Sequence, residues 1–235
     1  MKQVSFFYII IPFFLGIIAY LASNNLIVGA IVLLLGIIYF FLLFMKNFNN
    51  YRTSVKRFKI CYQFINTFII TLSIKLTIPS TLESTALSMD DEFKEEYEGI
   101  AHLTDKEKLD YLKNYFHFHL YELFLNVINL YEERGGNILD MSSYLLEESR
   151  NQNEYLIRTE SMAIRKWVEF AILWFLSLAI MVLLRFALSQ LFDKIAKQLI
   201  YQGTIVGIFA FALLSVEILA RKSFKLDLKG WNKNE

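Results

Sequence analysis

The chain has 235 residues, of which 55% are hydrophobic and 20% are charged, and its formal net charge is +1. A soluble domain usually has about 45–50% apolar residues, so this excess favours a membrane protein. The net charge gives no support to a nucleic-acid-binding class. The single cysteine, Cys61, excludes an internal disulfide framework.

Four long apolar stretches lie in two pairs, one near each end of the chain. The first pair is residues 4–21 and 26–45, and the second is residues 168–188 and 203–220. A hydrocarbon core of about 30 Å needs about 20 residues of helix, which is close to the length of each stretch. A secretory signal peptide is the alternative for the first stretch, but a second span follows it after a very short turn. We therefore expect four transmembrane helices, arranged as two hairpins.

The distribution of basic residues predicts the orientation of these spans. The segment after the second stretch contains five basic residues and no acid, namely Lys46, Arg52, Lys56, Arg57 and Lys59. The turn between the first two stretches, Ser23-Asn24-Asn25, has no charge. Since lysine and arginine are retained on the cytoplasmic side, we expect the middle of the chain and both termini in the cytoplasm. The predicted location is the inner, or cytoplasmic, membrane.

These features divide the sequence into four segments. A transmembrane hairpin at 1–45 precedes a helical bundle at 46–166. A second hairpin with a short amphipathic outer loop occupies 167–221, and a basic cytoplasmic tail occupies 222–235. Apolar residues recur at helical spacing in the bundle. The predicted fold class is an all-α membrane protein, in which the two hairpins flank a cytoplasmic antiparallel helical bundle.

Local signals predict where several helices begin and end. The polar residues 47–52 are expected to end the second transmembrane helix. Pro79 fits the first turn of a helix, because its missing N–H has no partner there in any case. Thr104 and Glu107 form the capping-box pattern of a helix start.

The end of the bundle is predicted in the same way. Gly135 and Gly136 are expected to stop a helix over residues 117–134, since glycine adopts the left-handed conformation of many helix ends. The last bundle helix should start near Ile138 and continue through Arg165 into the third span, because no residue between them breaks a helix.

Enzymatic chemistry has little support in the sequence. There is no P-loop, glycine-rich dinucleotide turn or zinc-protease motif, so we expect no enzyme activity and no cofactor. His117 and His119 lie about 200° apart on a helix, so they cannot bind one ion together. His119 and Glu122 are within reach of each other but supply too few ligands for a metal site.

Charged residues inside the apolar stretches often mark transport pathways. Here they are Glu169, Arg185 and Glu217, and each lies near an end of its stretch, where it reaches a membrane surface. Four spans without a polar cluster at mid-depth give little support to a transporter. A small transporter subunit is therefore the less favoured alternative.

Two segments of opposite charge are candidates for docking a partner, since complementary charge steers association. The acidic run at 90–98 contributes Asp91, Glu92, Glu95 and Glu96. The basic stretch at 46–59 contributes Arg52, Lys56 and Arg57. A solvated helix face is the alternative interpretation of the acidic run.

Two short motifs resemble the F domain of type II secretion systems, which also occurs in platform proteins of type IV and Tad pili. The first is Leu-Thr-Ile-Pro-Ser-Thr-Leu at 76–82. The second is Glu-Glu-Arg-Gly-Gly-Asn-Ile-Leu-Asp-Met at 132–141, followed by a charged helix. The matching residues are Pro79, Leu82, Gly135, Gly136, Asn137 and Leu139. The layout of two spans, one bundle and two spans is most similar to the Tad-type members.

The resemblance implies an inner-membrane platform that couples a cytoplasmic secretion ATPase to the assembly of pilin-like subunits. It implies no bound nucleotide and no nucleic acid. The implied partners are the ATPase, pilin-like subunits, the lipid bilayer, and either a sister platform subunit or a second copy in a homo-oligomer. The alternative is a membrane-anchored helical scaffold that is unrelated to secretion.

Overall fold

The computed structural model describes residues 2–224, except the side chains of residues 2–9, Leu191 and Asp193. Most of the predicted basic tail, residues 225–235, lies outside the described residues. Helices account for 90% of the structure, and the described part contains no strand, so the all-α prediction is confirmed. The described chain folds as two compact units, one formed by residues 2–51 and 160–224 and the other by residues 52–159.

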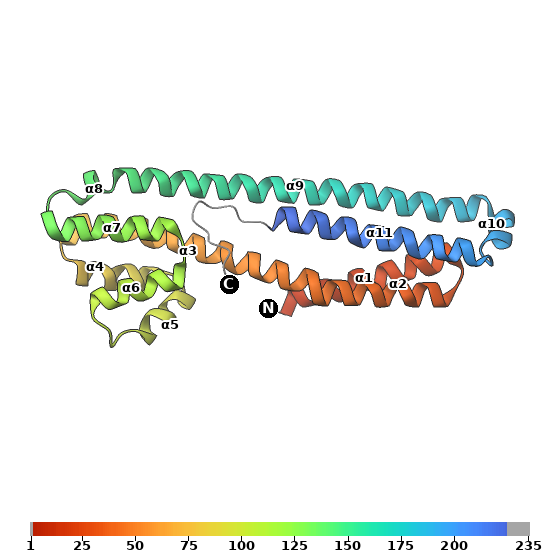
Figure 1. The fold of residues 1–235 in the computed structure, drawn as a ribbon, viewed down its shortest axis with the longest axis horizontal. Coiled ribbons are helices and arrows are strands. Elements are labelled where there is room, and N and C mark those ends of the chain that lie inside the picture. The colour runs from red at the N-terminus through yellow and green to blue at the C-terminus, as the bar shows by residue number, and fades with distance from the viewer. Residues whose placement is uncertain (1, 225–235) are drawn as a thin grey trace. The chain divides into compact units, whose positions relative to one another are not determined.

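Unit 1 consists of helices, most of which are apolar (Figure 1). They are α1 (Lys2–Ser23), α2 (Leu26–Tyr39), the π-helical turn η1 (Phe40–Phe44), the start of α3 (Met45–Lys75), the second part of α9 (Ser143–Ala187), α10 (Ser189–Ile195) and α11 (Leu199–Ser223). Three helices are long and apolar enough to span a membrane: the continuous stretch Leu26–Lys75, α9 and α11. The described side chains of α1 form a shorter apolar stretch, Ile10–Ser23.

Glycines allow α1 and α2 to approach each other closely. A methyl group placed on Gly16 would lie 2.9 Å from Cβ of Leu33, and one placed on Gly29 would lie 3.1 Å from the carbonyl oxygen of Gly16. A methyl group on Gly36 would lie 3.1 Å from Cβ of Pro12. Small residues give apolar helices this kind of contact, in which backbones pack directly against each other.

Gly16→Leu is therefore expected to force α1 and α2 apart. Overpacking of a close contact typically costs about 1–3 kcal/mol, so the variant should unfold at lower denaturant concentration. Denaturation of the detergent-solubilised protein, followed by circular dichroism, measures this shift. The matched control is Gly207→Leu, because no atom lies within 4 Å of a Cβ placed at Gly207. Equal stability of the two variants would contradict the close packing of α1 on α2.

The prediction that residues 47–52 end the second transmembrane helix is wrong. The helix continues through η1 and α3 to Lys75. The segment contains no proline or glycine, and its asparagines only lower helix propensity. Aromatic packing also holds it, since the rings of Phe44 and Phe48 lie 5.6 and 5.5 Å from that of Phe224.

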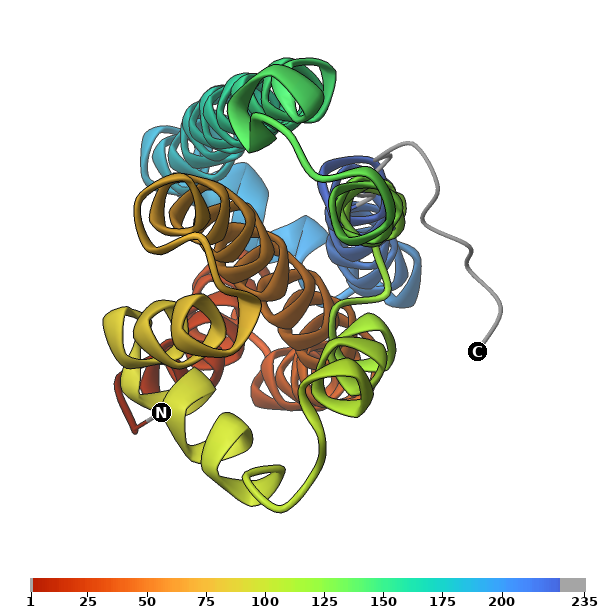
Figure 2. The same ribbon diagram turned by 90° about the vertical axis from the view of Figure 1, so that its left-hand side faces the viewer.

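Unit 2 contains the rest of α3, the start of α9 and five shorter helices. These are α4 (Ile78–Ser88), α5 (Asp91–Gly99), α6 (Asp105–Phe116), α7 (His119–Arg134) and α8 (Ile138–Met141). Figure 2 shows α3 running among the shorter helices. The core of the unit is strongly aromatic, and Phe58, Phe64 and Phe68 of α3 are fully buried in it.

Most predicted helix ends of unit 2 lie where the local signals placed them. Pro79 is in the first turn of α4. Thr104 caps α6 in a complete capping box with Glu107, and α7 ends at Arg134, directly before Gly135. The helix predicted to start at residue 117 begins instead at His119, because His117 has the left-handed conformation and ends α6.

The predicted continuous helix from Ile138 is interrupted once. Ser142 has φ −94° and ψ 1°, and it separates α8 from α9. Its hydroxyl donates to the carbonyl oxygen of Leu139 at 3.3 Å, so the side chain competes for a backbone acceptor. From Ser143 onward, α9 is unbroken over 45 residues.

Candidate functional site

The first motif forms the turn between α3 and α4. Leu76 has φ +59°, and its N–H donates to the carbonyl oxygen of Leu72 at 2.9 Å. Thr77 follows in extended conformation and precedes α4, and Leu82 packs fully buried in the core. Lys75 ends α3 directly before this motif. The sequence gives no signal for the left-handed conformation of Leu76, since leucine rarely adopts it.

The second motif forms the turn between α7 and α8. Gly135 has φ +63° and ψ −164°, and Gly136 has φ +110°. The Oδ1 atom of Asn137 accepts a hydrogen bond from the N–H of Leu139 at 3.0 Å and caps α8. Gly135 therefore occupies a region of φ and ψ that is essentially restricted to glycine. The conformations of Gly135 and Gly136 and the cap by Asn137 set the direction of the chain between α7 and α8.

The predicted acidic and basic docking segments meet within unit 2. The Nζ atom of Lys56 lies 3.6 Å from Oδ2 of Asp90 and also pairs with Glu92. The hydrogen bond to Glu92 raises the pKa of Lys56. Arg57 lies over the ring of Tyr115, with its Cζ atom 5.2 Å from the ring centroid. Lys56 and Arg57 thus interact with residues of unit 2 itself, so less of the opposite charge is available to a partner.

The remaining predicted docking residues differ in their exposure and in whether they already have a partner within unit 2. Glu96 accepts a hydrogen bond from the hydroxyl of Tyr111, which raises the pKa of that tyrosine. Asp91 is paired with Lys94 at 3.4 Å, but its side chain is 99% exposed. Glu95 and Arg52 are exposed as well. Asp91, Glu95 and Glu98 are therefore exposed acidic residues of α5 that Lys56 does not pair with.

The histidines of unit 2 do not form a metal site with their neighbours. His119 Nδ1 lies 3.3 Å from Glu122, whose other oxygen pairs with Lys113 at 3.4 Å. The hydrogen bonds with these two partners lower the pKa of Glu122, and His119 makes the larger contribution. Within the described part of the chain, no group of three or more histidine, cysteine, aspartate or glutamate side chains is placed to hold a metal.

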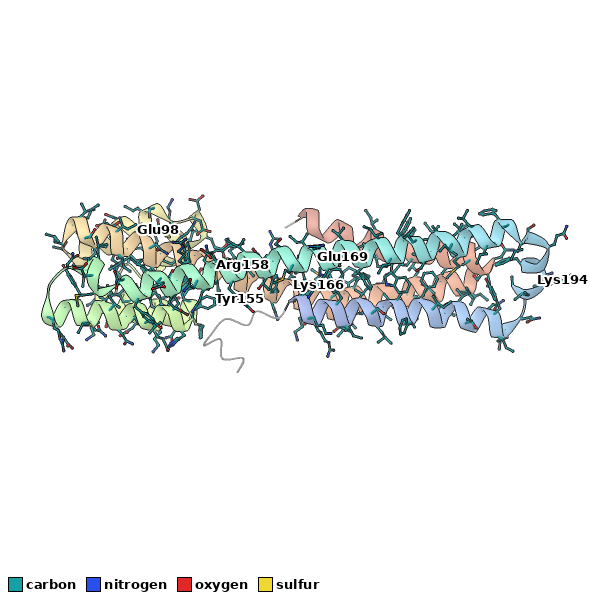
Figure 3. All side chains as sticks on the ribbon, turned by 90° about the horizontal axis from the view of Figure 1, so that it is seen from above. Glu98, Tyr155, Arg158, Lys166, Glu169 and Lys194 are labelled. Atoms are coloured by element: carbon teal, nitrogen blue, oxygen red, sulfur yellow. The ribbon has the colours of Figure 1, made fainter. Side chains whose placement is uncertain are left out.

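The three charged residues that the sequence placed inside the apolar stretches each have a partner within unit 1. Glu217 is almost completely buried, accepts a hydrogen bond from the hydroxyl of Tyr39 at 3.0 Å, and pairs with Nε of Arg221 at 2.7 Å. Arg185 donates to Oδ1 of Asn24 at 3.0 Å. Glu169, labelled on α9 in Figure 3, pairs with Arg165 at 3.0 Å.

Of these three residues, Glu217 is the one whose charge is buried among apolar side chains. A buried carboxylate is tolerated when it is paired and hydrogen-bonded, as Glu217 is. The bond between Glu217 and Tyr39 also links α11 to α2.

Comparison with known proteins identifies no relative of this chain. No family model, no curated protein and no solved structure matches the chain. The arrangement of the helices, the two turns and the exposed charges are therefore the features that bear on function.

Proposed function

We propose that this chain is a platform protein of a type II secretion or Tad-type pilus assembly machine in the inner membrane. In this proposal, unit 2 lies in the cytoplasm and binds a secretion ATPase, while the apolar helices of unit 1 form two membrane hairpins. The ATPase would drive conformational changes of unit 2, and unit 1 would engage pilin-like subunits in the bilayer.

The observation that carries the proposal is the order of elements along the chain. A bundle of helices lies between an apolar hairpin, α1 and α2, and a second pair of apolar helices, α9 and α11. The motifs that resemble the F domain coincide with the α3–α4 and α7–α8 turns. Helix α9 also contributes residues to both units without a break. An unbroken helix is suited to the transmission of force.

A membrane-anchored scaffold without a motor is the second candidate. It requires only the apolar helices and the exposed charges of unit 2, and it predicts no effect of an ATPase. A transporter subunit has less support, because Glu169, Arg185 and Glu217 each have a partner within unit 1.

The proposal predicts the membrane topology. Cys61 is fully buried, and burial raises the pKa of its thiol, so it should react poorly with maleimides. A cysteine introduced by Asn24→Cys should be labelled by a membrane-impermeant maleimide in intact cells. One introduced by Glu95→Cys should be labelled only after permeabilisation. Labelling of the second position in intact cells would contradict a cytoplasmic unit 2.

The proposal also predicts that a motor docks on α5. Neighbouring genes for a secretion ATPase, a prepilin peptidase and pilin-like proteins would supply the partners for the assay. Glu95→Lys should weaken co-purification of that ATPase and reduce secretion or piliation, because it reverses an exposed charge on the docking helix. The control is Glu83→Lys, an equal change of charge on α4. Unchanged ATPase binding by the Glu95 variant would exclude α5 as the docking site, and no ATPase binding by the wild type would favour the scaffold.

A further inference from the structure

Three apolar side chains are exposed where α3 ends. Ile70, Ile74 and Leu76 have 55%, 75% and 67% of their surface exposed. Ile70 and Ile74 are four residues apart, so they share one face of α3. Leu76 follows directly after the helix. Single exposed apolar residues are common, but a group of them at one place marks an interaction surface.

The backbone of Leu76 gives this group a second, independent feature. Its φ of +59° is strained for a side chain as bulky as leucine, and glycine would adopt it freely. The exposed side chain gains little packing energy in return. Strained residues persist at sites where the strain serves a purpose other than folding, so the Leu76 side chain is a candidate contact for a partner.

A groove begins at Ile78, two residues after Leu76 in the sequence. Ile78 lines it together with Leu109 of α6 and Leu125 and Ile128 of α7. Three carboxylates, from Asp105, Asp110 and Glu132, and one lysine, Lys106, line it as well. The groove therefore combines apolar side chains with an excess of negative charge.

More negative charge lies on the helices that begin or end here. Figure 1 shows the end of α7, α8 and the start of α9 together at the end of unit 2 where α4 begins. Besides Glu132 of the groove, they contribute three exposed carboxylates that form no ion pair with any described residue: Glu133, Asp140 and Glu147. Two exposed basic residues lie at helix ends of this region: Lys75 at the end of α3 and Arg134 at the end of α7.

We propose that this surface, formed by Ile70, Ile74, Leu76 and the neighbouring groove, binds a basic segment of another protein that inserts apolar side chains. The excess of negative charge selects a positively charged partner. A second copy of this surface would be repelled by its equal charge, and so would an anionic bilayer surface. The proposal rests on the proposed function only in placing unit 2 in water, and it is separate from motor docking on α5.

A defined peptide tests the surface without knowledge of the natural partner. The probe is a fluorescein-labelled 18-residue amphipathic helix of leucine and lysine, added to the full-length protein in phosphatidylcholine nanodiscs. Two matched peptides replace all lysines by glutamate or all leucines by serine. Fluorescence anisotropy should show tight binding of the leucine–lysine peptide alone, because the surface recognises both charge and apolar side chains.

Leu76→Gly gives the decisive variant, because it should change folding and binding in opposite directions. It relieves the backbone strain, so the melting temperature of the protein should rise. It also removes an apolar contact, so peptide binding should weaken about five- to tenfold, as for partial loss of a buried leucine. His117→Gly is the matched control, since His117 has φ +56° at the opposite end of α7. It should raise the melting temperature and leave binding unchanged.

Several outcomes would overturn the proposal. One is equal binding of the leucine–lysine peptide by wild type and by Leu76→Gly. Another is binding of the leucine–glutamate peptide as tight as that of the leucine–lysine peptide. The third is equal binding of the leucine–lysine peptide by empty nanodiscs and by nanodiscs that contain the protein. Topology is measured separately by the cysteine labelling, which uses no peptide. Failure of this surface is therefore distinguishable from failure of the platform proposal.

Discussion

Replacement of Phe64 by alanine is expected to destabilise unit 2 by about 3–5 kcal/mol, the usual cost of removing a buried phenylalanine. Phe64 is fully buried on α3, and its ring centroid lies within 6.2 Å of five other aromatic rings. These rings come from α3, α5, α6 and α7: Phe68, Phe93, Phe116, Tyr121 and Phe124. Loss of one side chain therefore opens a cavity at the point where four helices meet.

Hydrogen exchange measured by mass spectrometry is the appropriate readout, since it separates unit 2 from the apolar helices of unit 1. Amides of α5, α6 and α7 should exchange faster in the Phe64→Ala variant. The control is Tyr155→Ala, because Tyr155 is an exposed aromatic side chain on α9 (Figure 3). If Phe64→Ala left the exchange of all three helices unchanged, α3 would not form the centre of the unit.

Gly135→Ala is expected to cost about 1–3 kcal/mol of folding stability. An alanine at φ +63° and ψ −164° is sterically strained, even though no atom lies within 4 Å of a Cβ placed there. The cost therefore comes from the backbone alone. Urea denaturation of the detergent-solubilised protein, followed by circular dichroism, measures it.

A second glycine of unit 2 provides the control for this substitution. Gly99 is the last residue of α5, has open space around its Cβ position, and does not have a positive φ. Gly99→Ala should be neutral or stabilise the protein, since alanine reduces the entropy of the unfolded chain. If both variants were equally stable, the turn between α7 and α8 would not depend on glycine.

Features specified by nearby residues could be predicted from the sequence. Pro79, the Thr104–Glu107 capping box and Gly135 each act within one helical turn, and the structure has helix ends at all three. The continuation of α3 through residues 47–52 could not be read in this way. A run of polar residues lowers the helix propensity of a segment, but aromatic contacts with Phe224 depend on the tertiary fold.

The candidate site was predicted less completely, for the same physical reason. The charges of Lys56, Asp90 and Glu92 are visible in the sequence, but their pairing depends on how α3 and α5 pack. The conformation of Leu76 has no residue-type signal, because it opposes the preference of leucine. The exposure of Ile70 and Ile74 is also a property of packing, since their spacing equally suits a buried helix face.

The π-helical turn η1 has a consequence for the spacing of residues along the second apolar helix. In a π-turn the hydrogen bonds join residues five apart, so the turn accommodates one residue more than a regular α-helix. A chain lacking one residue of Phe40–Phe44 could close this turn as ordinary α-helix, keeping Tyr39 beside Glu217 and Phe48 beside Phe224. A deletion elsewhere in α2 or α3 would instead rotate one side of the helix by about 100° relative to the other. Length variation in this helix is therefore best tolerated at a single turn, next to Tyr39 and its hydrogen bond to the buried Glu217 of α11.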